Sequence, residues 1–113
     1  MRAAVIGSRE LDVDDLAAYL PDGLTEIVSG GARGIDTCAR AFAIANGIRL
    51  TEFLPEYNRY GKSAPLKRNI QIIDYADEVI AIWDGKSSGT AFVIRECRKR
   101  GKKVTVFQVE PKV

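Results

Sequence analysis

Residues 24–36 read Leu-Thr-Glu-Ile-Val-Ser-Gly-Gly-Ala-Arg-Gly-Ile-Asp. The apolar run from Leu24 to Val28 predicts a strand, and the segment from Asp36 to Asn46 predicts a helix. The glycines between them allow a tight turn and close approach of the backbone to a ligand. Such a turn presents backbone N–H groups at the positive end of the helix dipole, which favours binding of a phosphate or another anion. Arg33 adds a planar cation that matches a phosphate or carboxylate.

The alternation of short apolar runs with helical segments continues on both sides of this stretch. Strands are predicted at Ala3–Ile6, Leu24–Val28, Ile48–Leu54, Glu78–Trp83 and Lys103–Val109. Helices are predicted at Asp12–Leu20, Thr37–Asn46, Leu66–Tyr75 and Gly89–Arg100, with a polar loop at Pro55–Pro65 and a frayed tail at Glu110–Val113. Because parallel strands need a crossover helix, the pattern predicts an α/β fold. We expect a Rossmann-like, doubly wound, five-stranded parallel sheet in the order 3-2-1-4-5, with helices on both faces.

Length and composition limit the classes of protein that fit. The 113 residues form one expected domain over residues 1–113, and 17 basic against 15 acidic residues give a net charge of +2. This charge neither demands nor excludes a nucleic-acid partner. The chain has no histidine, which excludes a Ser-His-Asp or Cys-His site within one chain.

Cysteine usage and the N-terminal run point to a cellular location. Cys38 and Cys97 fall in predicted helices and are expected to be buried, reduced thiols. The apolar run at Ala3–Ile6 is too short for a signal peptide or a membrane span. We therefore expect a cytoplasmic protein with no membrane partner, no metal ion and no resident cofactor.

A doubly wound sheet binds ligands at the carboxyl ends of its strands, near the switch in strand order. Polar segments follow each of the first four predicted strands. The ligand-binding residues predicted in them are Gly7, Ser8, Arg9, Ser29, Gly30, Gly31, Ala32, Arg33, Gly34, Asp36, Tyr60, Lys62, Arg68, Asn69, Trp83, Asp84, Gly85, Ser87, Ser88, Gly89 and Thr90.

Several of these residues have a second interpretation. Asp36 either accepts a ribose hydroxyl or stabilises the first turn of its helix. Ser87, Ser88 and Thr90 either bind phosphate or cap the following helix. Trp83 is either packing at the rim of the cleft or a platform for a base.

Two common nucleotide-binding motifs are absent. Gly85-Lys86-Ser87 resembles the end of a P-loop, but Ile80-Ala81 stand where its first glycine belongs. A dinucleotide fingerprint needs three glycines after the first strand, where only Gly7 is present. A standard P-loop or NAD-type site is therefore not expected.

A larger set of ordered motifs carries a family resemblance. They are Gly7-Ser8-Arg9, Ser29 to Asp36, Tyr60-Gly61-Lys62-Ser63-Ala64-Pro65, Arg68-Asn69, Ala76-Asp77, Trp83-Asp84-Gly85 and Ser88-Gly89-Thr90. In this order they resemble the YspA-like branch of the SLOG superfamily, which groups the Rossmann domain of DNA-processing protein A (Smf) with the LOG cytokinin-activating nucleotide hydrolases. The resemblance covers nearly the whole chain. It implies a Rossmann-like fold, a nucleotide or nucleotide-derived ligand and a homodimer.

The chain departs from the LOG enzymes in the motif that carries their catalytic glutamate. Those enzymes carry Pro-Gly-Gly-x-Gly-Thr-x-x-Glu, in which the glutamate works with an arginine at the ribosyl bond. The matching stretch here keeps Gly89-Thr90 but places Val93 at the position of that glutamate. Valine cannot activate water, and Glu96 lies almost one helical turn later, so it would compensate only with a different geometry.

Three functions remain open. The first is a stand-alone binding or sensor domain for a nucleotide-derived ligand. The second is a hydrolase of a nucleotide N-glycosidic bond, for which the candidate catalytic carboxylates are Asp36, Asp84, Glu96 and Glu56. The third is a single-stranded DNA-binding protein of the DNA-processing type, with a groove formed by Arg33, Arg59, Lys62, Lys67 and Arg68.

Overall fold

A computed structural model describes residues 1–111 of the chain. Within this range five strands form one parallel sheet in the order β3-β2-β1-β4-β5. They are β1 (Arg2–Gly7), β2 (Glu26–Ser29), β3 (Arg49–Glu52), β4 (Glu78–Trp83) and β5 (Val104–Gln108). The predicted α/β class and strand order are confirmed.

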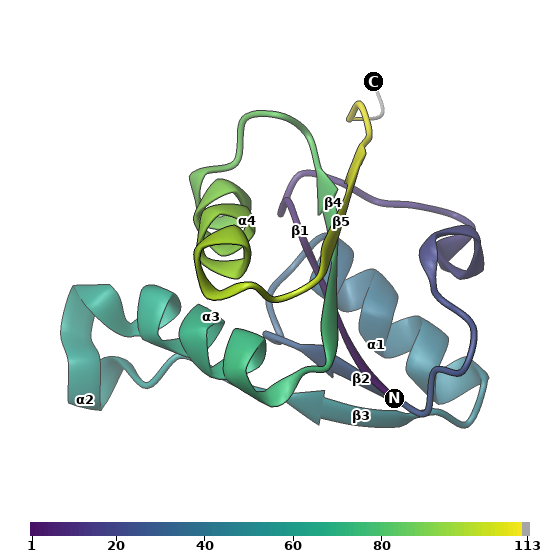
Figure 1. The fold of residues 1–113 in the computed structure, drawn as a ribbon, viewed down its shortest axis with the longest axis horizontal. Helices are drawn as coiled ribbons and strands as arrows, with labels where there is room; N and C mark the ends of the chain where they lie inside the picture. The colour runs from purple at the N-terminus through teal and green to yellow at the C-terminus, as the bar shows by residue number, and fades with distance from the viewer. Residues whose placement is uncertain (112–113) are drawn as a thin grey trace.

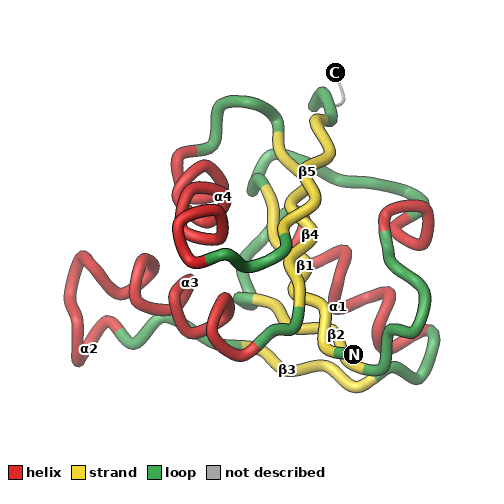
Figure 2. The backbone as a smooth tube through the Cα atoms, in the orientation of Figure 1, coloured by secondary structure: helices red, strands yellow, loops and turns green. Residues whose placement is uncertain are grey.

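Helices cover both faces of the sheet, as predicted (Figures 1 and 2). Helix α1 (Ile35–Ala45) and the short 3-10 turn η1 (Leu16–Tyr19) lie on one face, and α3 (Ala64–Tyr75) and α4 (Ser88–Arg100) lie on the other. Side chains of β1 alternate between the two faces, since Ala4 packs in the cluster with α3 and α4, whereas Val5 packs with α1. Burial on both sides explains why the central strands are almost wholly apolar.

Gly7 ends β1 at the point where α1 and β4 come closest to it. A Cβ atom at this position would lie 2.3 Å from the carbonyl oxygen of Ile82 and 2.6 Å from Cγ1 of Ile35. Only glycine therefore lets the start of α1 approach the centre of the sheet this closely. The close approach brings the turn after β1 beside the turn after β2.

The helix predicted at Asp12–Leu20 is wrong. The structure has only η1 in this segment. Leu11, in the stretch without helix or strand that precedes it, and Leu16, the first residue of η1, are both buried. These two residues are five positions apart, so an α-helix would direct them to different sides. Burial of both leucines against the sheet outweighs local helix formation.

The loop predicted at Pro55–Pro65 is also wrong in part. It contains the one-turn helix α2 (Tyr57–Tyr60), the 3-10 turn η2 (Gly61–Ser63) and the start of α3. Helix α2 buries none of its residues and stands away from the sheet in Figure 1. It therefore has no apolar face that a sequence pattern could reveal. Pro65 fits the first turn of α3, where its missing N–H is not needed.

The other predicted strands and helices are present with small shifts at their ends. Cys38 and Cys97 lie in α1 and α4 as free thiols, the first half-buried and the second buried. Of the predicted tail, Glu110 and Pro111 belong to no strand or helix, and residues 112–113 lie outside the described residues. Among residues 1–111, none of the helices combines the length and apolar character that crossing a membrane requires.

Candidate ligand-binding site

Two neighbouring cavities open at the carboxyl ends of the strands. The larger, of about 530 Å³, lies between the turn after β1 and the first turns of α3 and α4. The smaller, of about 280 Å³, lies between the glycine-rich turn after β2 and the residues that follow β3. Arg9, Ala32 and Arg68 line both cavities, so the two share a border.

The structure brings most of the predicted ligand-binding residues to these cavities. Those that line the larger cavity are Gly7, Ser8, Arg9, Ala32, Asp36, Arg68, Asn69, Asp84, Ser87, Ser88, Gly89 and Thr90. Those that line the smaller one are Arg9, Gly30, Gly31, Ala32, Arg33 and Arg68. Segments far apart in the sequence thus meet here, as expected for a doubly wound sheet.

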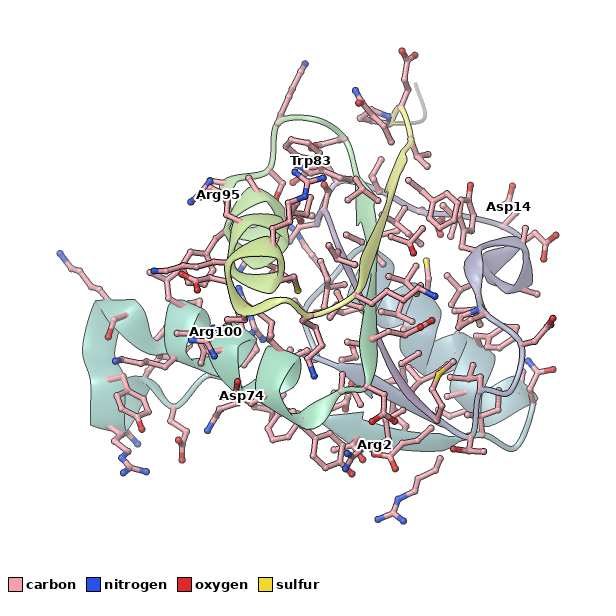
Figure 3. The ribbon with its side chains drawn as sticks, in the orientation of Figure 1. Arg2, Asp14, Asp74, Trp83, Arg95 and Arg100 are labelled. Atoms are coloured by element: carbon pink, nitrogen blue, oxygen red, sulfur yellow. The ribbon has the colours of Figure 1, made fainter. Side chains whose placement is uncertain are left out.

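Other predicted residues line neither cavity: Ser29, Gly34, Tyr60, Lys62, Trp83, Gly85 and Glu96. Trp83 packs at the edge of the core cluster on the α4 side of the sheet (Figure 3), and its Nε1 donates to the carbonyl oxygen of Ser87 at 3.0 Å. It therefore takes the packing role rather than that of a base platform. Glu96 is paired with Arg100 along α4, and Glu56 is an exposed residue before α2, so neither is placed for catalysis in these cavities.

Sequence reasoning missed several residues of the cavity walls. Glu10 and Lys86 line the larger cavity together with Leu66, and Tyr57 lines the smaller one. Glu10 and Lys86 directly adjoin predicted site residues, which was the available signal. Leu66 gave none. Tyr57 lies in the aromatic and basic loop at Pro55–Pro65, on whose tyrosines the sequence suggests that a base could stack, although it was not among the predicted site residues.

Arg68 is a buried cation at the shared border, only 6% exposed. Its Nη1 donates to the carbonyl oxygen of Gly30 at 2.5 Å, and its Nε donates to Oδ1 of Asn69 at 2.9 Å. Its Nη2 makes no hydrogen bond within residues 1–111 yet is reached by solvent. Arg68 therefore braces the glycine turn and leaves both N–H groups of its Nη2 unbonded within the described residues.

Asp36 is a buried carboxylate in the wall of the larger cavity, 8% exposed. Burial raises its pKa above the ordinary value, although the N–H of Ala32 and the charge of Arg68 act in the opposite direction. The N–H of Ala32 donates to Oδ2 of Asp36 at 3.1 Å. Asp36 thus holds the glycine turn onto the start of α1, and it also faces the cavity.

Arg9 lines both cavities together with Arg68 and has no carboxylate partner among the described residues. Among the described residues it forms no ion pair and no hydrogen bond. Burial lowers the pKa of Arg68, the charge of Asp36 raises it, and the charge of Arg9 lowers it further. Two guanidinium groups that repel one another mark a place where an anion would be stabilised.

Asp84 closes the turn that leads into α4. Its Oδ1 accepts the N–H groups of Lys86 and Ser87, both at 2.8 Å, and its own N–H donates to Oγ of Ser8 at 3.1 Å. The N–H groups of Ser87 and Lys86 hold the pKa of Asp84 below its ordinary value. This ionised carboxylate fixes the turn and links it to the turn after β1.

The first turns of three helices border the larger cavity. Asp36 comes from α1, Pro65 from α3, and Ser88, Gly89 and Thr90 come from α4. The first turn of α4 carries no acidic residue, so no charge of its own neutralises the positive end of its dipole. Val93, one turn further along α4, lines the cavity as an apolar wall at the position of the LOG glutamate. The arrangement favours binding of an anion and lacks that carboxylate.

No protein-family model matches the chain, and comparisons with curated proteins and with solved structures found no match.

Proposed function

We propose that this chain is a binding or sensor domain for a nucleotide or nucleotide-derived ligand, held at the carboxyl ends of the parallel strands. The observation that carries the proposal is the pair Arg9 and Arg68 on the border of the two cavities. Neither makes an ion pair within the described residues. A phosphate bound between them would relieve the repulsion between the two guanidinium groups. Its oxygens would also accept hydrogen bonds from the free Nη2 of Arg68.

The two cavities suit the two ends of such a ligand. The larger one has room for a ribose or a second phosphate beside the first turn of α4. Tyr57 lines the smaller one and is 58% exposed, so its ring offers a face on which a base can stack. Asp36 repels a second anion nearby but accepts a hydroxyl, which favours a sugar over a polyphosphate at its side of the cavity.

The family resemblance and the location belong to the same proposal. A YspA-like SLOG domain is the class that the ordered motifs favour, and a nucleotide ligand agrees with it. Cys38 and Cys97 are free thiols in the structure, which suits a cytoplasmic protein.

A second function, hydrolysis of a nucleotide N-glycosidic bond, is favoured by one observation. Asp36 is a cavity carboxylate whose pKa is raised by burial, and groups of this kind are enriched in catalytic sites. Val93 argues against it, because the carboxylate that LOG enzymes use is missing. The binding function therefore remains the main proposal.

Native mass spectrometry against AMP, ADP-ribose, NAD, cyclic nucleotides and a short oligonucleotide tests both functions. We expect an intact nucleotide to be retained by the wild-type chain and lost in Arg9→Ala. Lys62→Ala is the matched control, since it removes one exposed cation that lines neither cavity. Equal loss in both variants, or no retained nucleotide, would contradict the proposal.

The same samples distinguish the alternatives. Release of free base would favour the hydrolase, and its loss in Asp36→Asn would assign the carboxylate. Retention of the oligonucleotide alone, with affinity that falls steeply with salt, would favour a single-stranded DNA-binding protein.

A further inference from the structure

The two edges of the sheet differ in a way that the ligand site does not explain. Edge strand β3 has four residues and carries a charge at each end, Arg49 and Glu52. Edge strand β5 has five residues, Val104–Gln108, and none is charged. Soluble proteins commonly keep their free edges short and charged, because an uncharged edge pairs with other strands. In Figure 1 no helix or loop is drawn in front of β5.

The backbone of β5 has open hydrogen-bonding groups along this edge. The carbonyl oxygen of Lys103 accepts from the N–H of Val79, and the N–H of Val109 donates to the carbonyl oxygen of Trp83. Odd-numbered residues of β5 therefore direct their backbone groups toward β4. The even-numbered residues Val104, Val106 and Gln108 direct theirs outward, and within residues 1–111 nothing accepts from or donates to them there.

We propose that β5 pairs in antiparallel fashion with β5 of a second copy of this chain, about a two-fold axis at Val106. In this register Val106 faces the partner's Val106, and Val104 faces the partner's Gln108. Every outward N–H and carbonyl group of β5 then finds a partner, because paired residues share the same parity. The two sheets join into one continuous sheet, and both free β5 edges are covered.

Charge complementarity supports this occupant and this register. The register places Lys102 opposite the partner's Glu110, and the two-fold axis repeats the pair. Nζ of Lys102 already donates to the carbonyl oxygen of Ala76 at 2.5 Å, which fixes its position and leaves two further N–H groups. Glu110 is exposed. If the axis shifts by two residues in either direction, Lys102 no longer faces the partner's Glu110. The charges at the ends of β5 therefore favour pairing with a second copy about an axis at Val106.

Sedimentation velocity of the full chain over a range of concentrations measures the dimer. Gln108→Pro removes an outward N–H at an exposed edge position where proline breaks no bond to β4. We expect it to weaken the dimer by at least about tenfold, since two inter-strand hydrogen bonds are lost and the ring obstructs pairing. Gln108→Ala removes the same side chain but keeps the N–H, so it should dimerise like the wild type. A wild-type chain that stays monomeric, or equal effects of the two variants, would overturn the proposal.

Amide hydrogen exchange locates the surface independently of these variants. The N–H groups of Val106 and Gln108 should become protected as the wild-type concentration rises, whereas Thr105 and Phe107 stay protected throughout because they bond to β4. If Gln108→Pro does not fold, Glu110→Lys serves instead, and it should weaken the dimer most at low salt. A dimer whose formation leaves exchange at Val106 unchanged uses another surface, and that result would also overturn the proposal.

Discussion

Nη1 of Arg68 lies 2.5 Å from the carbonyl oxygen of Gly30 and donates a hydrogen bond to it, which ties α3 to the turn after β2. The same nitrogen would lie 2.5 Å from a Cβ atom at Gly30. One contact thus explains both why position 30 is a glycine and why a buried arginine is tolerated beneath the candidate ligand-binding site.

Gly30→Ala should destabilise the protein. The added methyl group would push the Arg68 guanidinium off its hydrogen bond to the carbonyl oxygen of Gly30, so we expect the free energy of unfolding to fall by about 1–3 kcal/mol. Gly89→Ala is the control, because a Cβ there meets nothing within 4 Å. Urea denaturation of both variants measures the difference, and equal stability of the two would contradict the packing argument.

Arg68→Met should lower the free energy of unfolding by about 2–3 kcal/mol, because it removes the hydrogen bond to Gly30. It should also raise the pKa of Asp36 further, since the charge of Arg68 favours the ionised carboxylate. Arg68→Lys keeps that charge, so it should lose stability while changing the pKa of Asp36 less. An NMR titration of the Asp36 carboxyl checks this, and an unchanged pKa in Arg68→Met would show that the two charges are not coupled.

Asp36 should make the protein less stable as pH rises. Burial raises its pKa above the ordinary value of 3.8, so the folded chain binds this proton more tightly than the unfolded chain. Stability is therefore lost between the ordinary pKa and the raised folded pKa, and the loss is complete above it. Asp36→Asn cannot ionise and still accepts from Ala32. Its stability relative to the wild type should increase across this window in denaturant titrations, and a decrease would refute the assignment.

Asp84 should have the opposite pH dependence. Its pKa is held low by the N–H groups of Ser87 and Lys86, so its contribution to stability is present above the ordinary pKa and is lost as pH falls through the lowered one. Asp84→Ala should remove this acid sensitivity and loosen the turn before α4. Lys86→Ala keeps the backbone N–H and should behave like the wild type. Acid unfolding monitored by circular dichroism compares the three chains.

The success and failure of the sequence predictions have distinct physical causes. Strands such as β4 are buried on both faces, and their apolar runs are visible without tertiary information. The segment at Asp12–Leu20 resembled a helix, but the structure buries Leu11 and Leu16 along a path whose only regular element is the short 3-10 turn η1. Helix α2 has no buried residue, so the sequence contains no periodic spacing of apolar residues that would predict it. A local stretch of sequence predicts its element well when the spacing of its apolar residues alone shows which side chains are buried.

The candidate site likewise contains residues that the sequence predicted correctly and residues that it did not. Arg9, Arg68 and Asp36 were predicted and do line the larger cavity, because the carboxyl ends of parallel strands meet at one edge. Tyr60 and Lys62 were predicted from loop composition and lie outside both cavities. The ring of Tyr60 instead lies 5.1 Å from the guanidinium of Arg59 and 5.9 Å from Nζ of Lys67.

The sequence by itself determined the parallel sheet, its strand order and the edge at which polar turns gather. Hydrophobic periodicity and the handedness of crossovers leave few other topologies for five alternating strands and helices. Only the tertiary structure decided which side chains face a shared cavity, that Asp36 is buried beside Arg68, and that the outward groups of β5 are open. Side-chain burial and direction depend on packing between segments distant in sequence, and the free energies of those contacts are not encoded in any local stretch of the chain.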